Sequence, residues 1–248
     1  KKNIIFMSTP YDKESADLLE SLNVSCYKIA STDTNNYPLL EHIAKKGIPM
    51  IISTAMSTFE EVREAVKVVR DSGLKNVAIL QCTGNYPSKL EDSNLRVMNT
   101  YRETFQCPIG YSDHTPQMIN PISATAMGAN IFEKHFTLDK KSPGPDHRMS
   151  LEPDELKQTI KLIRETEMAL GTDKKNILEV EKNNRLNLRK SVVAIKDIKQ
   201  GQAIDLSMID IKRPGVGLEP KNYEIILGKK SKVDIKKDTV IEKDFILW

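Results

Sequence analysis

The sequence has few of the residues that mark several common protein classes. Its 248 residues include only 3 cysteines, 11 glycines and 12 prolines, and aromatic residues make up 6% of the chain. This composition excludes disulfide scaffolds, collagen-like chains and mucin-like chains. No apolar run approaches the roughly 20 residues that a membrane-spanning helix needs. We therefore expect a globular protein with no membrane partner.

Neither charge nor cysteine spacing indicates a nucleic-acid-binding or a secreted protein. The 37 Lys and Arg residues nearly balance 34 Asp and Glu residues, which leaves a net charge of +3. Without a clustered basic patch, so small a surplus argues against nucleic acid as a partner. Cys26, Cys82 and Cys107 stand alone in apolar stretches, with no CxxC spacing. This pattern is typical of reduced core thiols, so we expect a cytoplasmic protein.

Short apolar or β-branched runs recur along the first two thirds of the chain. They cover residues 3–8, 26–30, 49–53, 77–81, 107–111 and 130–136. The runs are continuous rather than alternating, as strands covered on both faces are. Amphipathic helical patterns lie between them, and the spacing of about 25 residues suits one strand–helix unit with short loops. The pattern predicts an α/β protein with a parallel sheet.

Polar residues follow almost every predicted strand at its carboxyl end, among them Ser53-Thr54 and the run from Ser112 to His114. A (β/α)8 TIM barrel uses all of its strand ends for chemistry, whereas an open doubly wound sheet uses only its switch point. No glycine-rich phosphate fingerprint follows any strand. We therefore predict a TIM barrel over residues 1–171, of which six units are visible. The first two units are expected to be absent, since the chain begins at Lys1 directly before an apolar run.

A second, smaller domain is predicted after a polar linker at residues 172–187. In residues 188–248 the segment 198–204 recurs 37 residues later as 235–241, which is a pseudo-repeat of short β segments and turns. Arg213 stands between the two copies, before Pro214 and Gly215, in a stretch that suits irregular backbone. We expect a compact β-rich module, too small to bury a large core by itself.

His114 and His135 lie at the ends of the last two predicted strands. On adjacent barrel strands both imidazoles would reach one side of the barrel mouth and could share a divalent metal ion. Imidazoles without thiolates suit a metal site that keeps positions open for water and substrate. The alternative is a pair of unrelated polar residues at the barrel rim.

Two charged residues are expected inside the barrel. Glu133 precedes His135 by two positions and so shares its face of the strand, while Lys28 stands between Tyr27 and Ile29 in an apolar strand. A buried carboxylate there is a candidate acid or base, and a buried lysine is a candidate partner for a phosphate or carboxylate. The alternative is an ion pair between the two side chains.

Several motifs together resemble the sialic acid synthase family, whose members use phosphoenolpyruvate to build nine-carbon keto acids. The resemblance covers almost all of the chain. Its motifs are Ser8-Thr9-Pro10, Tyr27-Lys28-Ile29 with Ser31, Asn35 to Pro38, Ser53-Thr54, Gln81-Cys82-Thr83 with Asn85-Tyr86-Pro87, Gly110 to Thr115, Glu133 to Thr137, Gly144-Pro145-Asp146, and Lys212 to Gly215. The C-terminal module resembles the antifreeze-like, or SAF, domain of these synthases.

The resemblance implies roles for particular residues. His114 and His135 match the two protein ligands of a divalent metal ion, with Mn²⁺ as the favoured ion and Mg²⁺ or Co²⁺ as alternatives. Glu133 and Asp33 match acidic, catalytic positions. Other matches are to residues that hold phosphoenolpyruvate, namely Thr9, Lys28, Ser31 and Ser112, and to residues that contact the amino sugar, namely Asn85, Tyr86 and Asp146. Arg213 matches an arginine that the SAF domain inserts into the partner's site, which implies a domain-swapped homodimer.

The resemblance implies condensation of phosphoenolpyruvate with an N-acetylated amino sugar, either N-acetylmannosamine or a diacetamido hexose. A second hypothesis comes from the expected absence of two barrel units. A barrel without its first strands could be a non-catalytic sugar-binding or assembly protein derived from such a synthase.

Overall fold

The computed structural model describes residues 4–248 and divides after Gly171 into two compact units. The first unit contains a five-stranded parallel sheet in the order β1-β2-β3-β4-β5, curled into a half-barrel. Its strands are β1 (Tyr27–Ile29), β2 (Met50–Ser53), β3 (Val77–Cys82), β4 (Ile109–Asp113) and β5 (Ile131–Lys134). This confirms the predicted α/β barrel architecture, with part of the barrel present.

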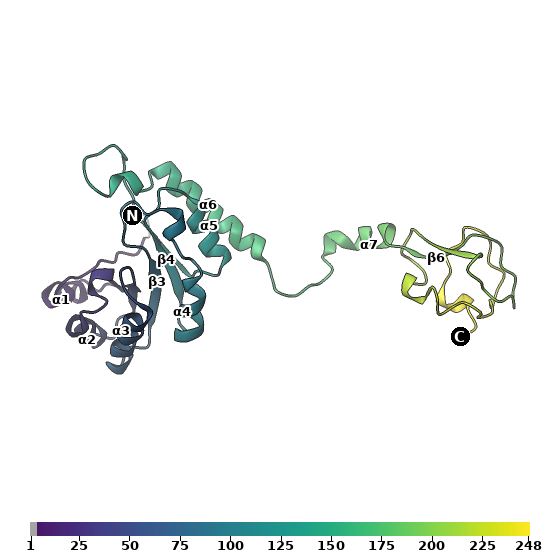
Figure 1. Ribbon diagram of the computed structural model, residues 1–248, viewed down its shortest axis with the longest axis horizontal. Helices are drawn as coiled ribbons and strands as arrows, with labels where there is room; N and C mark the ends of the chain where they lie inside the picture. Colours follow the sequence, from purple (N-terminus) through teal and green to yellow (C-terminus); the bar gives the residue numbers. More distant parts are fainter. Residues whose placement is uncertain (1–3) are drawn as a thin grey trace. The chain divides into compact units, whose positions relative to one another are not determined.

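Helices alternate with the strands along the chain, and Figure 1 shows α1–α3 grouped together and α5 beside α6. The helices are α1 (Lys13–Ser21), α2 (Tyr37–Ala44), α3 (Phe59–Asp71), α4 (Val97–Phe105), α5 (Ile119–Ala126) and α6 (Pro153–Leu170). The start of α3 is set by Thr58, whose hydroxyl accepts from Glu61 N while the Glu61 carboxylate accepts from Thr58 N. Val62, Val66 and Val69 of this helix are buried, as its apolar spacing predicts.

The predicted first strand, residues 3–8, is the main departure from the expected elements. Asn3 lies outside the described residues, and residues 4–7 have no strand pairing. Only Ser8 reaches the sheet, through an isolated parallel bridge to Tyr27 in which Lys28 N donates to Ser8 O at 3.2 Å. Ile4 is 82% exposed, so this apolar segment has little contact to hold it as a strand.

The register of β4 and β5 aligns the residues that precede the two histidines. Ser112 pairs with Glu133, and Asp113 pairs with Lys134. The two strands approach closely at Gly110, where an added Cβ would lie 2.1 Å from the Ile131 carbonyl oxygen. Glycine is therefore required at this point of the sheet, and the close approach brings the two strand ends together.

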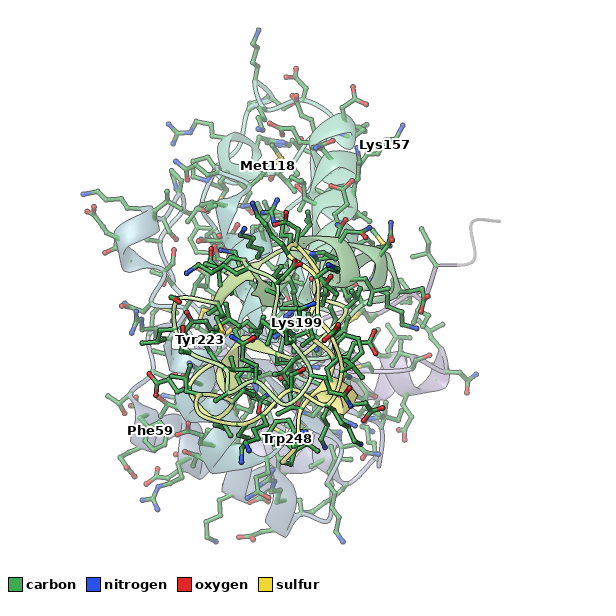
Figure 2. All side chains as sticks on the ribbon, turned by 90° about the vertical axis from the view of Figure 1, so that its right-hand side faces the viewer. Phe59, Met118, Lys157, Lys199, Tyr223 and Trp248 are labelled. Atoms are coloured by element: carbon green, nitrogen blue, oxygen red, sulfur yellow. The ribbon has the colours of Figure 1, made fainter. Side chains whose placement is uncertain are left out.

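The second unit, Thr172–Trp248, has a small antiparallel sheet of β6 (Ser191–Ala194) and β7 (Ile209–Lys212). The two copies of the pseudo-repeat pair directly, since Ile198 and Ile235 exchange two backbone hydrogen bonds of 2.8 Å. The core beneath them is rich in isoleucine, including Ile204 and Ile241. Figure 2 labels Tyr223 and Trp248 among the side chains of this unit.

The segment predicted as a linker, residues 172–187, contains a helical stretch. A 3-10 turn at Glu179–Glu181 leads into α7 (Lys182–Leu188). Every residue from 171 to 190 is exposed, and α7 is joined to the rest of the second unit by Gly215 N, which donates to the Leu186 carbonyl oxygen at 2.7 Å. No helix among residues 4–248 is long and apolar enough to cross a membrane.

Candidate functional site

A cavity of about 670 Å³ opens at the carboxyl ends of the strands. Parallel strands present their carboxyl ends at one edge of the sheet, which is where barrel enzymes bind their substrates. The cavity is lined by Thr9, Tyr11, Lys28, Ala30, Ser31, Thr32, Ser53, Ala55, Met56, Cys82, Tyr86, Ser112, His114, Glu133, His135, Pro145 and Asp146. Most of the residues predicted for the site therefore surround one space.

Lys28 and Glu133 face each other across the cavity wall. Lys28 Nζ lies 3.4 Å from Glu133 Oε2 and donates to the Ile29 carbonyl oxygen at 3.1 Å. Ser112 Oγ donates to Glu133 Oε1 at 2.9 Å. The ion pair that the sequence left open is present, and both of its members also line the cavity. The lysine side chain is 10% exposed, so it presents a largely desolvated positive charge to whatever enters.

The hydroxyl-bearing residues Thr9, Ser31 and Ser53 line the same cavity as this pair. Ser31 Oγ accepts from Ala55 N at 2.9 Å, and Thr9 lies half-buried beside the start of β1. Ser53 at the end of β2 was not singled out as a site residue, yet its hydroxyl is buried and has no hydrogen-bond partner among residues 4–248. A buried hydroxyl without a partner carries a free-energy cost that a bound oxygen atom would remove. Its position directly before Thr54 at a strand end was the available signal.

The rings of His114 and His135 lie together, with centroids 5.3 Å apart. His114 Nδ1 lies 2.8 Å from the Thr83 carbonyl oxygen, an acceptor, so Nδ1 carries the proton and Nε2 keeps its lone pair. Burial lowers the pKa of His114, and the neighbouring His135 acts in the same direction, while the bond to Thr83 opposes them. The pocket therefore favours the neutral imidazole, which is the form that binds metals.

Tyr86 and Asp146 complete this side of the cavity. The Tyr86 ring lies 4.1 Å from the His114 ring and 5.8 Å from the His135 ring, measured between centroids. Asp146 Oδ2 lies 3.6 Å from His135 Nδ1. A carboxylate at this nitrogen orients the ring so that its other nitrogen can face a bound ion.

The donor set fits a divalent ion that is held partly by water and substrate. Two imidazoles at adjacent strand ends would supply nitrogen ligands, and the carboxylates Glu133 and Asp146 line the same cavity. Within residues 4–248, no group of three His, Cys, Asp or Glu side chains could hold an ion. Two such ligands would leave several coordination positions open, as in catalytic rather than structural metal sites.

Three predicted site residues lie outside the cavity wall. The Asp33 carboxylate accepts from Asn36 Nδ2 at 2.9 Å and from Thr32 Oγ1 at 3.2 Å, and it is buried behind the wall. Asn85 is exposed in the loop after β3, where its carbonyl oxygen accepts from Ser88 Oγ. Arg213 belongs to the second unit, where it is exposed and donates from Nε to the Leu188 carbonyl oxygen at 3.2 Å.

Sequence reasoning also missed several residues of the cavity wall besides Ser53, namely Tyr11, Thr32, Ala55, Met56, Cys82 and Pro145. Cys82 and Pro145 stand in motifs of the family resemblance but were assigned no role, and most of the others are apolar or lie in loops, where residue type does not indicate binding. Met56 adopts a left-handed backbone conformation, with φ of 61°, which places its exposed side chain at the cavity edge. Such a conformation cannot be recognised from a methionine in the sequence.

Comparison with known proteins places this site in a family. The NeuB family model matches residues 1–175, and the SAF domain model matches residues 189–247. An uncharacterized protein of Methanocaldococcus jannaschii is 43% identical over 247 residues, which cover 100% of this chain and 73% of that protein. The N,N'-diacetyllegionaminic acid synthase of Campylobacter jejuni is 41% identical over 98% of this chain and 73% of its own length.

A solved structure supports the same placement. The N-acetylneuraminic acid synthetase of Leptospira borgpetersenii superposes with a TM-score of 0.70 at 34% identity, covering 74% of this chain and 64% of that structure. The family model spans the whole half-barrel with its cavity, and the SAF match spans the β-rich unit. The chain belongs to the NeuB family and carries a C-terminal SAF domain.

Proposed function

We propose that this chain is a synthase that condenses phosphoenolpyruvate with an N-acetylated amino sugar to give a nine-carbon sialic-acid-type keto acid and phosphate. The acceptor is N-acetylmannosamine or a diacetamido hexose. One observation carries the proposal: a single cavity brings together an ammonium group, several hydroxyls, a carboxylate and two imidazoles at the strand ends. Relatives named as synthases of legionaminic and neuraminic acids support the same chemistry.

Phosphoenolpyruvate occupies the part of the cavity around Lys28. Its phosphate and carboxylate carry several negative charges, and the desolvated Lys28 ammonium compensates them strongly in this setting. The hydroxyls of Thr9, Ser31 and Ser112 donate to the phosphate oxygens. Ser53, whose buried hydroxyl lacks a partner among the described residues, gains one when the substrate binds.

His114 and His135 hold a divalent ion, with Mn²⁺ favoured and Mg²⁺ or Co²⁺ as alternatives. A bound ion supplies Lewis-acid polarisation of the sugar aldehyde. Tyr86 and Asp146, which lie against the two histidines, and Asn85 in the loop after β3 orient the amino sugar. The aldehyde carbon then faces the phosphoenolpyruvate held by Lys28, which lowers the entropic part of the barrier.

Carboxylates move protons in the reaction. Carbon 3 of phosphoenolpyruvate attacks the aldehyde carbon, and the aldehyde oxygen takes up a proton to become a hydroxyl. Water adds at carbon 2 with release of a proton, and the resulting tetrahedral intermediate loses phosphate. Glu133, held by Ser112 and Lys28, accepts the proton of the attacking water at Oε2. Asp33 does not line the cavity itself. It takes part through Thr32, a residue of the cavity wall whose hydroxyl donates to the Asp33 carboxylate.

A domain-swapped homodimer completes the site, with Arg213 of one copy contacting the sugar bound by the other. Arg213→Ala is then expected to raise the KM for the sugar more than the KM for phosphoenolpyruvate. Steady-state kinetics with each substrate varied in turn measures this difference, and sedimentation velocity measures the dimer. Equal KM values for the sugar in both proteins would contradict the role of Arg213.

Phosphate release tests the whole proposal. Metal-free protein is mixed with phosphoenolpyruvate and a panel of acetamido sugars, with and without Mn²⁺, and the nine-carbon product is identified by mass spectrometry. Sugar-dependent phosphate release that requires Mn²⁺ supports the synthase. Sugar binding without phosphate release would instead favour a non-catalytic sugar-binding protein.

A further inference from the structure

A buried ion pair lies directly behind the two histidines. Lys134 precedes His135 and Asp113 precedes His114, and the register of β4 and β5 pairs these two residues. Lys134 Nζ lies 2.7 Å from Asp113 Oδ2, and the side chains are only 4% and 0% exposed. Because neighbouring residues of a strand point to opposite faces, this pair lies on the helix side of the sheet while the imidazoles face the cavity.

The pair contacts both residues that flank His114. Lys134 Nζ also donates to the Thr115 carbonyl oxygen, so one ammonium group holds the residue before His114 and the residue after it. Asp113 Oδ1 accepts from Thr115 N at 3.0 Å and from Thr115 Oγ1 at 2.9 Å. The carboxylate thus closes the turn that His114 occupies.

Helix α5 joins the same network through Asn120. Its Nδ2 donates to Asp113 Oδ1 at 3.1 Å and to Ser93 Oγ at 2.9 Å. The end of β4 is therefore fixed to β5, to α5 and to the loop before α4 by polar contacts that have defined directions. The backbone ladder fixes the register of the two strands, but apolar packing has no preferred direction and would not fix the turn at His114 beyond the end of β4.

Stability alone gives a weak reason for such a pair. The desolvation of two charges offsets most of their attraction, so apolar residues of similar volume often stabilise a protein as well or better. The outward-facing residues that precede it on β4, Ile109 and Tyr111, belong to the apolar core. The switch from apolar residues to a buried ion pair occurs at the position next to His114.

We propose that Asp113 and Lys134 form a clamp that sets the separation of the His114 and His135 rings for binding a divalent ion. Both are positioning residues, because they act through the histidines and face away from the cavity. The inference rests on the proposed metal site. It adds that the affinity for the ion depends on a charge pair on the opposite face of the sheet.

The main experiment compares Lys134→Met with Lys46→Met in the full chain. Lys46 is a matched control, since its side chain is also only 10% exposed and its ammonium contacts the carboxylates of Asp17 and Glu20. It lies after α2 and, within residues 4–248, has no contact with the two histidines. Mn²⁺ affinity is measured by electron paramagnetic resonance, and the unfolding midpoint by circular dichroism. Loss of a residue that orients metal ligands typically weakens binding by about 10–100-fold. We expect this loss in Lys134→Met and wild-type affinity in Lys46→Met.

A double variant covers the case in which Lys134→Met fails to fold. Asp113→Asn with Lys134→Met removes both charges and leaves no unpaired buried carboxylate, so it is expected to fold. It should bind Mn²⁺ as weakly as the single variant. Wild-type affinity in either folded variant would overturn the clamp.

Ring signals of the histidines provide a readout that needs no metal. In metal-free protein, nitrogen-15 NMR should show shifted or broadened signals of His114 and His135 in the clamp variants and unchanged signals in Lys46→Met. Unchanged signals in the clamp variants would overturn the clamp by themselves. Failure of the wild type to bind Mn²⁺ would instead contradict the proposed metal site, and the NMR comparison would still decide whether the clamp orders the rings.

Discussion

The two units of the chain bury different kinds of side chain. The half-barrel buries charged and ionisable groups near its strand ends, including Lys28, Asp113 and His114. Within residues 172–248, all of which the structure describes, the buried polar side chains are the hydroxyls of Ser191 and Ser231. Both hydroxyls donate to backbone carbonyl oxygens and so belong to the scaffold.

This difference distinguishes side chains that a functional site needs from side chains that only stabilise the fold. A buried charge costs free energy unless partners compensate it, so buried charges that line a cavity, such as Lys28, or lie directly behind its wall, such as Asp113, indicate a functional site. The second unit shows what the same chain does where no such site is built. Its isoleucine core is apolar, and its ion pairs, such as Lys236 with Asp197, lie on the surface.

The largest expected effect is the loss of a histidine from the half-barrel cavity. His114→Ala and His135→Ala each remove one of the two proposed imidazole ligands, and Lewis-acid catalysis contributes several kcal/mol of transition-state stabilisation. We expect metal-dependent phosphate release to fall by at least ~100-fold. Circular dichroism serves as the control for folding. Full turnover in either variant after removal of trace metal would show that the reaction does not depend on the histidines of the half-barrel cavity.

The second prediction is a loss of stability confined to the second unit, which has no buried charged site. Ile241 is fully buried in the isoleucine core, so Ile241→Ala should destabilise that unit by about 2–5 kcal/mol. The chain has one tryptophan, Trp248, whose fluorescence reports unfolding of this unit in urea. Ile225→Ala is the control, because Ile225 is 54% exposed. A loss of Mn²⁺ binding in folded Ile241→Ala would contradict the separation of the two units' roles.

Much of the half-barrel could be predicted because continuous apolar runs mark parallel strands covered on both faces. Each of the five strands lies within two residues of a predicted run, and the valines of α3 are buried at their predicted spacing. Residues 4–7 were mistaken for a strand because apolar character does not reveal whether a partner strand is present. The exposed helix α7 was missed because it has no apolar face for a pattern to detect.

The candidate site was predictable where chemistry depends on residue type and position. Lys28, Glu133 and the two histidines are polar residues at strand ends, and all four line one cavity. Asp33 is also acidic and near a strand end, but its contacts to Asn36 and Thr32 hold it behind the wall. Side-chain direction after a strand depends on turn geometry, which a single sequence does not specify.

A third prediction tests whether a buried cation of the half-barrel serves binding. Lys28→Met keeps the length of the side chain and removes its charge. A hydrogen bond to a charged group contributes about 1.5–3 kcal/mol, so we expect the KM for phosphoenolpyruvate to rise by about 10–100-fold. The KM for the sugar should change less, and Lys45→Met, at an exposed lysine, should change neither. An unchanged KM for phosphoenolpyruvate would reduce Lys28 to a structural partner of Glu133.

The smallest expected effect is a difference in pH dependence between the two units. All four histidines lie in the half-barrel, and burial holds the pKa of His114 below its ordinary value of 6.5. From that value down to the lowered pKa, the unfolded chain binds more protons than the folded chain, so the free energy of unfolding falls as the pH falls. The half-barrel should therefore lose stability between pH 7 and pH values below 6.5, and His114→Gln should reduce this loss.

The second unit supplies the control for this titration within the same molecule. It has no histidine, and several of its carboxylates, such as Asp197 and Asp234, have pKa values lowered from 3.8 by hydrogen bonds to lysine side chains or backbone amides. Their contribution is lost only in more acidic solution, as the pH falls from near 3.8 through their lowered values. In metal-free protein, the urea midpoint measured by circular dichroism, a signal dominated by α1–α6, should decline between pH 7 and pH values below 6.5. The urea midpoint measured by Trp248 fluorescence should stay level over the same pH range. Parallel declines of both signals would mean that the burial of His114 does not distinguish the two units.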